Sequence, residues 1–180
     1  MIVLGLGSNI GNKLEYLESA IHYLSESVIN ITDISPIYES PALLKAGAPA
    51  DWNTPFFNMA VMGESHLSPQ AFLTQIKCIE NKVGRHDRGV WAPREIDIDI
   101  LAYEGLYIDE GNLKIPHISL CERAFALLPL ADIAPNWRYP ASGQYNGKTA
   151  YEIARIVFTA DNTTVKTAHR LNLQRRKMVA

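Results

Sequence analysis

The chain has 180 residues, of which 47% are hydrophobic and 20% are charged, and its formal net charge is −2. This length and composition are typical of one globular domain and exclude a disordered or fibrous protein. The near-neutral charge gives no broad attraction to nucleic acid, so any site for anions must be local.

The cysteines and the N-terminus bear on the location of the protein. Cys78 and Cys121 lie in unrelated contexts, which argues against a disulfide framework or a zinc site and favours a reducing cytoplasm. The apolar run that follows Met1 is too short for a signal peptide or a membrane span. We therefore expect a cytoplasmic protein with neither a membrane nor a nucleic-acid partner.

Apolar periodicity predicts the elements of the first half of the chain. Residues 2–6 predict a buried strand, and Asn12 followed by Glu15 resembles a capping box that opens a helix. The β-branched residues from 28 to 37 favour a second strand, and a loop rich in proline and glycine follows at 44–55. Residues 57–62 predict a third strand.

The second half begins with a well-marked helix. Ser68-Pro69 is a helix start, and Gly84 is the expected end of that helix. Residues 96–100 predict a further strand, 103–115 a hairpin, and 122–130 and 149–158 two more helices. The order strand, helix, strand, strand, helix, strand predicts an α+β ferredoxin-like sandwich, with both helices on one face of an antiparallel sheet.

The domain organisation follows from this order of elements. We expect a single domain at 1–160, in which the hairpin and C-terminal helices are additions to the sandwich. Residues 161–180 form a basic tail, for which a solvated or loosely docked state is favoured over a nucleic-acid or partner contact.

The strand at 96–100 carries the strongest functional signal, because Asp97 and Asp99 alternate with isoleucines. Alternate residues of a strand share a face, so the two carboxylates lie roughly 7 Å apart on one side of it. Like charges at this spacing repel unless a cation lies between them, and Mg²⁺ is often held by such a pair together with substrate phosphates. Removing either charge is expected to lower turnover by orders of magnitude with little unfolding.

Several other residues have a structural and a functional interpretation. The pair could belong to a half-solvated edge strand. By spacing, Glu80 favours pairing with an arginine over a substrate contact, and a lone His117 favours a structural role. Phe56 and Phe125 are core residues by default, although an aromatic pair could enclose a flat heterocycle.

The glycine-rich segment at 5–11 does not match a nucleotide-binding loop. Ile10 stands where the third glycine of a dinucleotide motif would fall, and the chain has no P-loop motif. The glycines instead indicate a close approach of strand and turn, with Asn9 and Asn12 in turn or cap roles.

The motifs of the chain resemble, in order and spacing, those of the 6-hydroxymethyl-7,8-dihydropterin pyrophosphokinases of folate biosynthesis. The resemblance covers roughly the first 135 residues. It is carried by Gly7-Ser8-Asn9, Ser35-Pro36-Ile37-Tyr38-Glu39-Ser40-Pro41, Phe57-Asn58, Ile79-Glu80, Val83-Gly84-Arg85, Trp91-Ala92-Pro93-Arg94-Glu95-Ile96-Asp97-Ile98-Asp99, Ile115-Pro116-His117 and Glu122-Arg123-Ala124-Phe125.

The resemblance implies transfer of the β,γ-diphosphoryl group of MgATP to the hydroxymethyl group of a reduced pterin, with AMP as the other product. It implies that Asp97 and Asp99 bind two Mg²⁺ ions and that Arg85 and Arg94 stabilise the charge of the leaving group. It further implies an ATP site formed by Lys77, Glu80, Arg88, Trp91, Arg94, Ile100, His117 and Arg123.

The same resemblance implies a pterin site in which the ring stacks between Phe56 and Phe125. Its hydrogen-bonding edge would meet Asn58 and the backbone near Ser40, Pro41 and Leu43. The loops at 44–55 and 85–93 would act as lids. The expected partners are ATP and 6-hydroxymethyl-7,8-dihydropterin, and the expected oligomeric state is a monomer.

Two alternatives belong to other functional classes. A Mg²⁺-dependent nucleotidyl transferase or phosphohydrolase could use the same carboxylate pair and would release pyrophosphate or phosphate instead of AMP. A ligand-sensing ferredoxin-like module would bind a small molecule without turnover.

Overall fold

The computed structural model describes residues 1–103, 105–140, 142–158 and 163–171. Its helices are α1 (Lys13–Ser27), α2 (Pro69–Val83), α3 (Ala124–Ile133) and α4 (Ala150–Phe158), with 3₁₀ turns at Ala50–Trp52 and Leu120–Glu122. Its strands are β1 (Ile2–Ser8), β2 (Asn30–Ile34), β3 (Tyr38–Ser40), β4 (Phe56–Glu64), β5 (Asp97–Tyr103), β6 (Ile108–Glu110), β7 (Leu113–Ile115) and β8 (Val165–Lys166).

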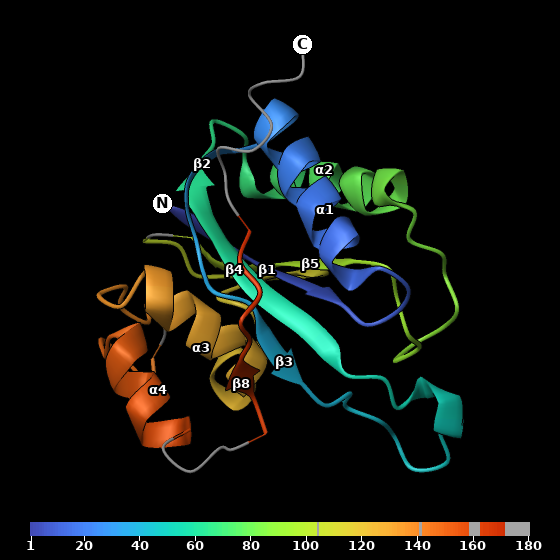
Figure 1. The fold of residues 1–180 in the computed structure, drawn as a ribbon. Helices are drawn as coiled ribbons and strands as arrows, with labels where there is room; N and C mark the ends of the chain where they lie inside the picture. Colours follow the sequence, from blue (N-terminus) through green and yellow to red (C-terminus); the bar gives the residue numbers. More distant parts are fainter. Residues whose placement is uncertain (104, 141, 159–162, 172–180) are drawn as a thin grey trace.

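The main sheet is antiparallel and has the order β5-β1-β4-β3-β8, with β2 also paired to β4 (Figure 1). Strands β1 and β4 lie at its centre, and β5 flanks β1. This arrangement confirms the expected ferredoxin-like sandwich. It also agrees with the rejection of a dinucleotide fold, because the glycine-rich β1 pairs with antiparallel neighbours on both sides.

The helix boundaries confirm the signals in the sequence. The side chain of Asn12 accepts the Glu15 N–H and caps α1. Ser68 caps α2 in the same way, with Pro69 at its first position, and the helix ends where Gly84 adopts a left-handed φ of 107°. These residues satisfy backbone groups that a helix end leaves unpaired.

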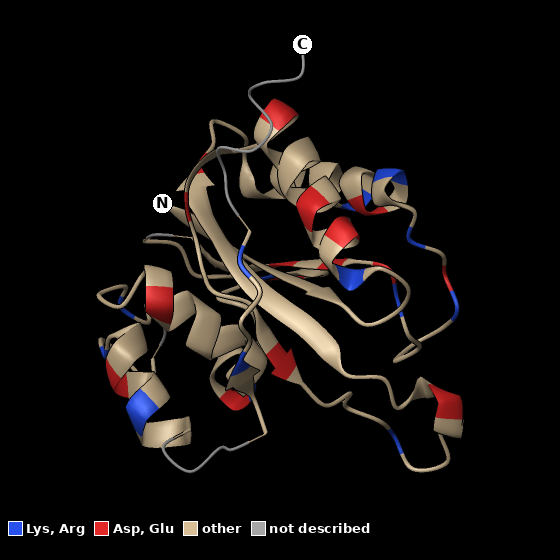
Figure 2. Cartoon of the chain, in the orientation of Figure 1, with Lys and Arg blue, Asp and Glu red and all other residues tan. Residues whose placement is uncertain are grey.

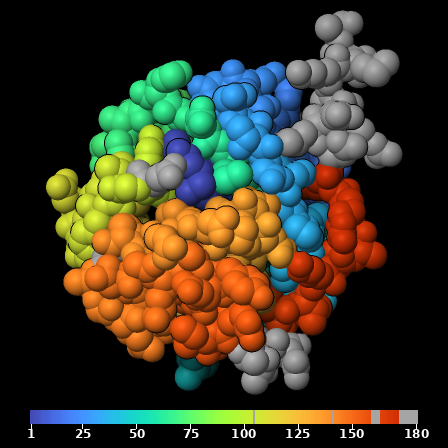
Figure 3. All heavy atoms as spheres, turned by 90° about the vertical axis from the view of Figure 1, so that its left-hand side faces the viewer, coloured from blue at the N-terminus to red at the C-terminus, as the bar shows by residue number. Residues whose placement is uncertain are grey.

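Two apolar layers sandwich the sheet. Helices α1 and α2 cover one face through a core that includes Leu17, Phe72 and Ile98. Helices α3 and α4 cover the other face around Leu127 and Ile153. The side view shows the α3–α4 layer in orange below the blue and green elements (Figure 3). The predicted hairpin is confirmed as the β6–β7 pair.

The strand expected at 28–37 is split into β2 and β3. Proline has no N–H to donate to a ladder, so pairing is interrupted at Pro36. Ser35 compensates for the interruption, because its hydroxyl accepts the Ala60 N–H at 2.8 Å while its own N–H donates to the Ala60 carbonyl at 2.9 Å.

Of the two states favoured for the predicted tail, solvated or loosely docked, the described part adopts the docked one, with its strand residues exposed. Strand β8 pairs with β3, and Lys166 Nζ lies 2.9 Å from a carboxylate oxygen of Asp132 on α3. Residues 161–162 and 172–180 of the predicted tail lie outside the described residues, and the boundary at 160 stays a prediction.

Charges of both signs are interspersed along the chain, as Figure 2 shows, in keeping with the small net charge. None of the helices in the described ranges is long and apolar enough to cross a bilayer.

Candidate active site

The strand β5 places both aspartates on the face of the sheet that carries the cleft. Ile96, Ile98 and Ile100 point into the opposite core and are at most 5% exposed. The side chains of Asp97 and Asp99 are 26% and 40% exposed and line the cleft. The alternation predicted from the sequence is therefore confirmed, and it places an acidic pair at the opening of the site.

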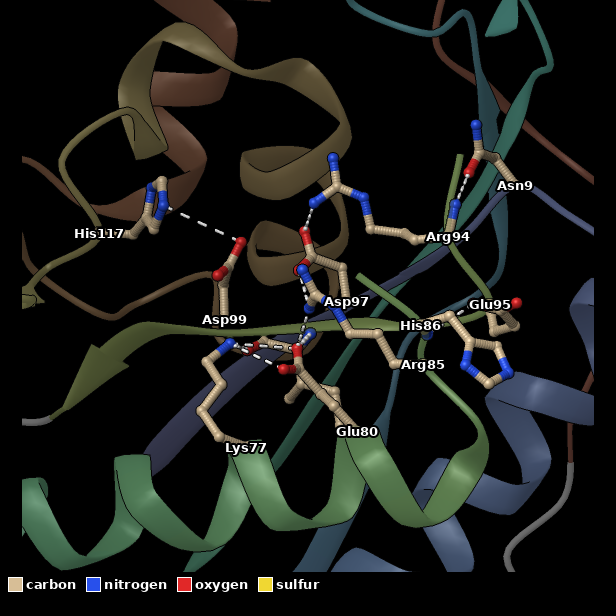
Figure 4. Close-up of polar contacts among 11 residues, drawn as sticks. Asn9, Lys77, Glu80, Arg85, His86, Arg94, Glu95, Asp97, Asp99 and His117 are labelled. Atoms are coloured by element: carbon tan, nitrogen blue, oxygen red, sulfur yellow. Dashed lines mark hydrogen bonds and ion pairs between the residues drawn. The ribbon is translucent and has the colours of Figure 1, made fainter. Parts of the chain in front are cut away.

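Asp97 is held by two arginines (Figure 4). Arg85 Nη1 lies 2.6 Å from Asp97 Oδ1, and Arg94 Nη1 lies 3.0 Å from Oδ2. Burial alone would raise the pKa of Asp97, but the charges of Arg94 and Arg85 outweigh it and lower that pKa below its ordinary value. Asp97 is therefore a charged acceptor with both oxygens engaged.

Asp99 lacks such a partner. Its closest ion-pair contact in the described chain is His117 Nε2, at 3.9 Å from Oδ2. Burial and the neighbouring charge of Asp97 raise the pKa of Asp99. Burial also lowers the pKa of His117, whose Nδ1 accepts the Ser119 N–H at 3.2 Å. The pair is thus electrostatically asymmetric: the arginines stabilise the charged form of Asp97, whereas burial and the charge of Asp97 disfavour the charged form of Asp99.

Glu80 lies on α2 and contacts residues next to the aspartate pair. It is 2% exposed, and its Oε1 accepts hydrogen bonds from Arg85 Nη1 at 2.6 Å and from the Ile98 N–H at 2.7 Å. Lys77 Nζ lies 3.0 Å from its other oxygen. Burial raises the pKa of Glu80 in spite of these partners. The ion pair between Glu80 and an arginine, which the sequence favoured over a substrate contact, is therefore present and involves Arg85.

Aromatic and polar side chains form the adjoining half of the open cleft. Phe56 and Phe125 both line it, as do Ser40, Pro41, Leu43 and Asn58. Asn58 is 6% exposed and donates to the Ser40 hydroxyl at 3.0 Å. Every residue predicted for the pterin site thus lies around one space, next to the aspartates.

Trp91 and Arg123 complete the rim between the two halves. The Arg123 guanidinium lies 6.0 Å from the Trp91 ring centre and 5.9 Å from that of Phe125. Trp91 has a φ of 71°, which is unusual for a residue other than glycine. Outliers of this kind are frequent in ligand-binding loops, and this one holds an aromatic ring at the cleft.

Two residues predicted for the nucleotide site lie elsewhere. The side chain of Ile100 is packed in the core on the α1–α2 side of the sheet. Arg88 forms a fork with Glu95, with distances of 2.6 and 2.9 Å, and does not line the cleft. Arg85, Lys77, Glu80 and His117 lie beside the cleft, in contact with the aspartates or with one another.

The donor set fits a hard divalent cation that shares its coordination with a substrate. Asp97 and Asp99 supply carboxylate oxygens on one face, and the raised pKa of Asp99 marks uncompensated negative charge. Among the described residues there is no group of three or more His, Cys, Asp or Glu side chains arranged to hold a metal. Phosphate and water oxygens would have to complete the coordination.

Sequence reasoning missed residues that shape the cleft without carrying charge. A Cβ on Gly7 would lie 3.1 Å from Asn58 Oδ1 and 3.5 Å from the Phe56 ring, so the absence of a side chain leaves room at the cleft floor. Leu101 and Met59 also line the cleft. The glycines at 5–11 were the only sequence signal for this feature. They indicated a close approach to the strand, but not that Asn58 and Phe56 are the residues that approach it.

Fold and site together define a ferredoxin-like α+β domain whose cleft joins an aromatic pair to an acidic and arginine-rich edge. The model of the 7,8-dihydro-6-hydroxymethylpterin-pyrophosphokinase (HPPK) family matches residues 3–135. The chain belongs to this family.

Individual relatives agree with this assignment. The 2-amino-4-hydroxy-6-hydroxymethyldihydropteridine pyrophosphokinase of Aquifex aeolicus is 42% identical over 139 residues, which cover 77% of this chain and 83% of that protein. The folate synthesis bifunctional protein of Chlamydia muridarum is 40% identical over 158 residues, which cover 86% of this chain. The chain spans only about 35% of the length of that relative.

A solved structure supports the fold. Wild-type HPPK-DHPS of Plasmodium falciparum has a TM-score of 0.64 at 16% identity, over 92% of this chain and 47% of that one.

Proposed function

We propose that the chain transfers the β,γ-diphosphoryl group of ATP to the hydroxymethyl oxygen of 6-hydroxymethyl-7,8-dihydropterin. The products would be AMP and the pterin diphosphate, in folate biosynthesis. The observation that carries this proposal is the continuity of the cleft. Phe56 and Phe125 line the same cleft as Asp97, Asp99 and Arg94. A flat heterocycle that stacks on the two rings would therefore lie next to the carboxylates and the arginine.

The pterin subsite has the chemistry that a flat, polar-edged ring needs. The rings of Phe56 and Phe125 offer stacking surfaces, and the buried amide of Asn58 is held in place by its bond to Ser40. A few fixed polar groups in an otherwise apolar pocket give orientation and specificity. In this proposal Asn58 and the backbone near Pro41 and Leu43 read the edge of the pterin.

The phosphate subsite provides positive charge that a substrate can recruit. Arg85 and Arg94 are engaged with Asp97. Guanidinium groups in general form strong, directional bonds to phosphate oxygens. The triphosphate would compete for these donors and for Lys77 and Arg123. Phosphoryl transfer depends mainly on such positioning and charge neutralisation, with little covalent participation by the protein.

Asp97 and Asp99 would hold Mg²⁺, with two ions in our proposal. Bound there, Mg²⁺ supplies charge neutralisation and orients phosphate oxygens. Arg85 and Arg94 would stabilise negative charge on the departing AMP. Trp91, His117 and Arg123 would border the nucleotide, with Glu80 fixing Arg85 from below. We also propose a cytoplasmic monomer with no nucleic-acid or membrane partner.

Phosphorus NMR with ATP, Mg²⁺ and 6-hydroxymethyl-7,8-dihydropterin tests the proposal. The expected products are AMP and a pterin that carries a diphosphate. ADP, free pyrophosphate or inorganic phosphate as the main product would overturn it in favour of a phosphohydrolase or nucleotidyl transferase. Binding of the pterin without turnover would favour a sensor. An Asp99→Asn variant is the matched control for contaminating phosphatases.

A further inference from the structure

Asn9 is a buried polar residue that the proposed chemistry does not use. It follows β1 directly and is 4% exposed. Its Oδ1 accepts the Arg94 N–H at 2.8 Å, and its backbone N–H donates to the Arg94 carbonyl at 3.2 Å (Figure 4). Its Nδ2 donates to the hydroxyl of Thr54 at 2.9 Å and to the carbonyl of Thr54 at 3.2 Å. Both ends of the side-chain amide are thus engaged.

These bonds join the two loops that border the cleft. Thr54 lies near the end of the first loop, at 44–55, two residues before Phe56 of the aromatic pair. Arg94 directly follows the second loop, at 85–93, and its guanidinium contacts Asp97 and lies 5.9 Å from the Phe56 ring. Asn9 therefore links the segment that carries Phe56 to the segment that carries Arg94, and its bonds fix the distance between them.

The chemistry of the contact requires an amide. One atom must accept a hydrogen bond from a backbone N–H while its neighbour donates to two oxygens, and a primary amide does both. Aspartate at this position would keep the acceptor, lose the bond to the Thr54 carbonyl and place a negative charge against that oxygen. Alanine would leave the Arg94 N–H and the oxygens of Thr54 without their bonds to Asn9, at a partly buried position.

We infer that Asn9 is a positioning residue that fixes the pterin wall at Phe56 relative to the phosphate-binding edge at Arg94 and Asp97. The inference rests on the proposed function. In that reaction the hydroxymethyl oxygen of the pterin comes from the Phe56 side, and the phosphorus of ATP that it attacks comes from the Arg94 and Asp97 side. A misplacement of reacting groups by about 1 Å can cost on the order of 10²-fold in rate. A cap or turn role alone would affect stability and leave the rate unchanged.

The test compares Asn9→Ala with Asn12→Ala, at a temperature well below the melting temperature of both variants. Asn12 is exposed and caps α1 without lining the cleft, so its variant loses stability and should keep kcat within about twofold of wild type. Asn9→Ala should lower kcat by on the order of 10²-fold. If Asn9→Ala does not fold, Asn9→Asp serves instead, and it should also lower kcat because it loses the bond to the Thr54 carbonyl and places a negative charge against that oxygen.

A second readout does not depend on activity. Amide hydrogen exchange should be at least about tenfold faster at Arg94 in Asn9→Ala than in wild type, and unchanged there in Asn12→Ala. A folded Asn9 variant that keeps wild-type kcat, or an unchanged exchange rate at Arg94, would overturn the inference. Failure of the wild-type protein to form AMP would instead overturn the proposed function, which separates the two.

Discussion

Replacing Asp97 and Asp99 separately by asparagine should change stability in opposite directions. From the sequence alone, loss of either charge is expected to leave the fold intact, because like charges on one strand face repel. The structure changes this expectation for one of the two. Asp97 bonds to Arg85 and Arg94, whereas the closest ion-pair contact of Asp99 in the described chain is the His117 imidazole at 3.9 Å.

The magnitudes follow from these contacts. Hydrogen bonds to charged groups contribute about 1.5–3 kcal/mol each when buried, and Asp97 accepts two. About a quarter of each side chain is exposed, and Arg85 keeps Glu80 as a partner. We therefore expect Asp97→Asn to lower the free energy of unfolding by about 2 kcal/mol. Asp99→Asn removes repulsion and should leave stability unchanged or raise it by about 0.5 kcal/mol.

The assay is urea denaturation at pH 7 with EDTA, followed by turnover at saturating Mg²⁺ and ATP. Both variants should lose on the order of 10³-fold or more in kcat, because both carboxylates belong to the proposed metal site. Mg²⁺ should raise the unfolding midpoint of the wild type more than that of either variant.

Two outcomes would refute this reasoning. Unchanged stability in Asp97→Asn would mean that the arginines do not hold Asp97 in solution, and a loss in Asp99→Asn equal to that in Asp97→Asn would contradict the asymmetry of the pair. Near-wild-type turnover by either variant at saturating Mg²⁺ would remove the metal assignment.

Three further predictions concern the cleft floor, a loop and the C-terminal strand. Gly7→Ala should raise KM for the pterin by about tenfold, because the new methyl group would lie against Asn58 in the cleft; steady-state kinetics check this. Arg88→Ala should lower the free energy of unfolding at neutral pH, because Glu95 loses both bonds of the fork. Arg88 holds the pKa of Glu95 at about 2, below the ordinary 4.5, so this stabilisation is complete above about pH 4.5 and is lost as pH falls through about 2. Urea titrations of both proteins across this range should therefore converge at low pH. Lys166→Ala should lower the melting temperature by a few degrees with kcat unchanged, because it frees β8 from α3 without touching the cleft.

Each of these predictions has a contrary outcome. An unchanged pterin KM in the glycine variant would show that the cleft floor is not part of the pterin site. A wild-type-to-variant difference that stays constant from pH 7 to about 2 would mean that the Arg88–Glu95 fork does not set the pKa. Loss of kcat in the lysine variant would place the C-terminal strand in the catalytic machinery.

The sequence by itself determined the local features of this protein. The capping box at Asn12, the Ser68-Pro69 start and the Gly84 end of α2 depend on contacts within a few residues, so the pattern alone predicts them. The alternation that sets Asp97 and Asp99 on one face is equally local. The order of elements then indicated the ferredoxin-like sandwich, and the motifs indicated the family.

Only the tertiary structure decided how residues distant in sequence meet. Asp97 and Asp99 look equivalent along the strand, yet Arg85 and Arg94 neutralise one of them and not the other. Asn9 appears as a turn residue until the fold brings it to Arg94, 85 positions away. Such contacts depend on which loops pack at the end of the sheet, and that packing is set by long-range burial and hydrogen bonding, not by local propensity.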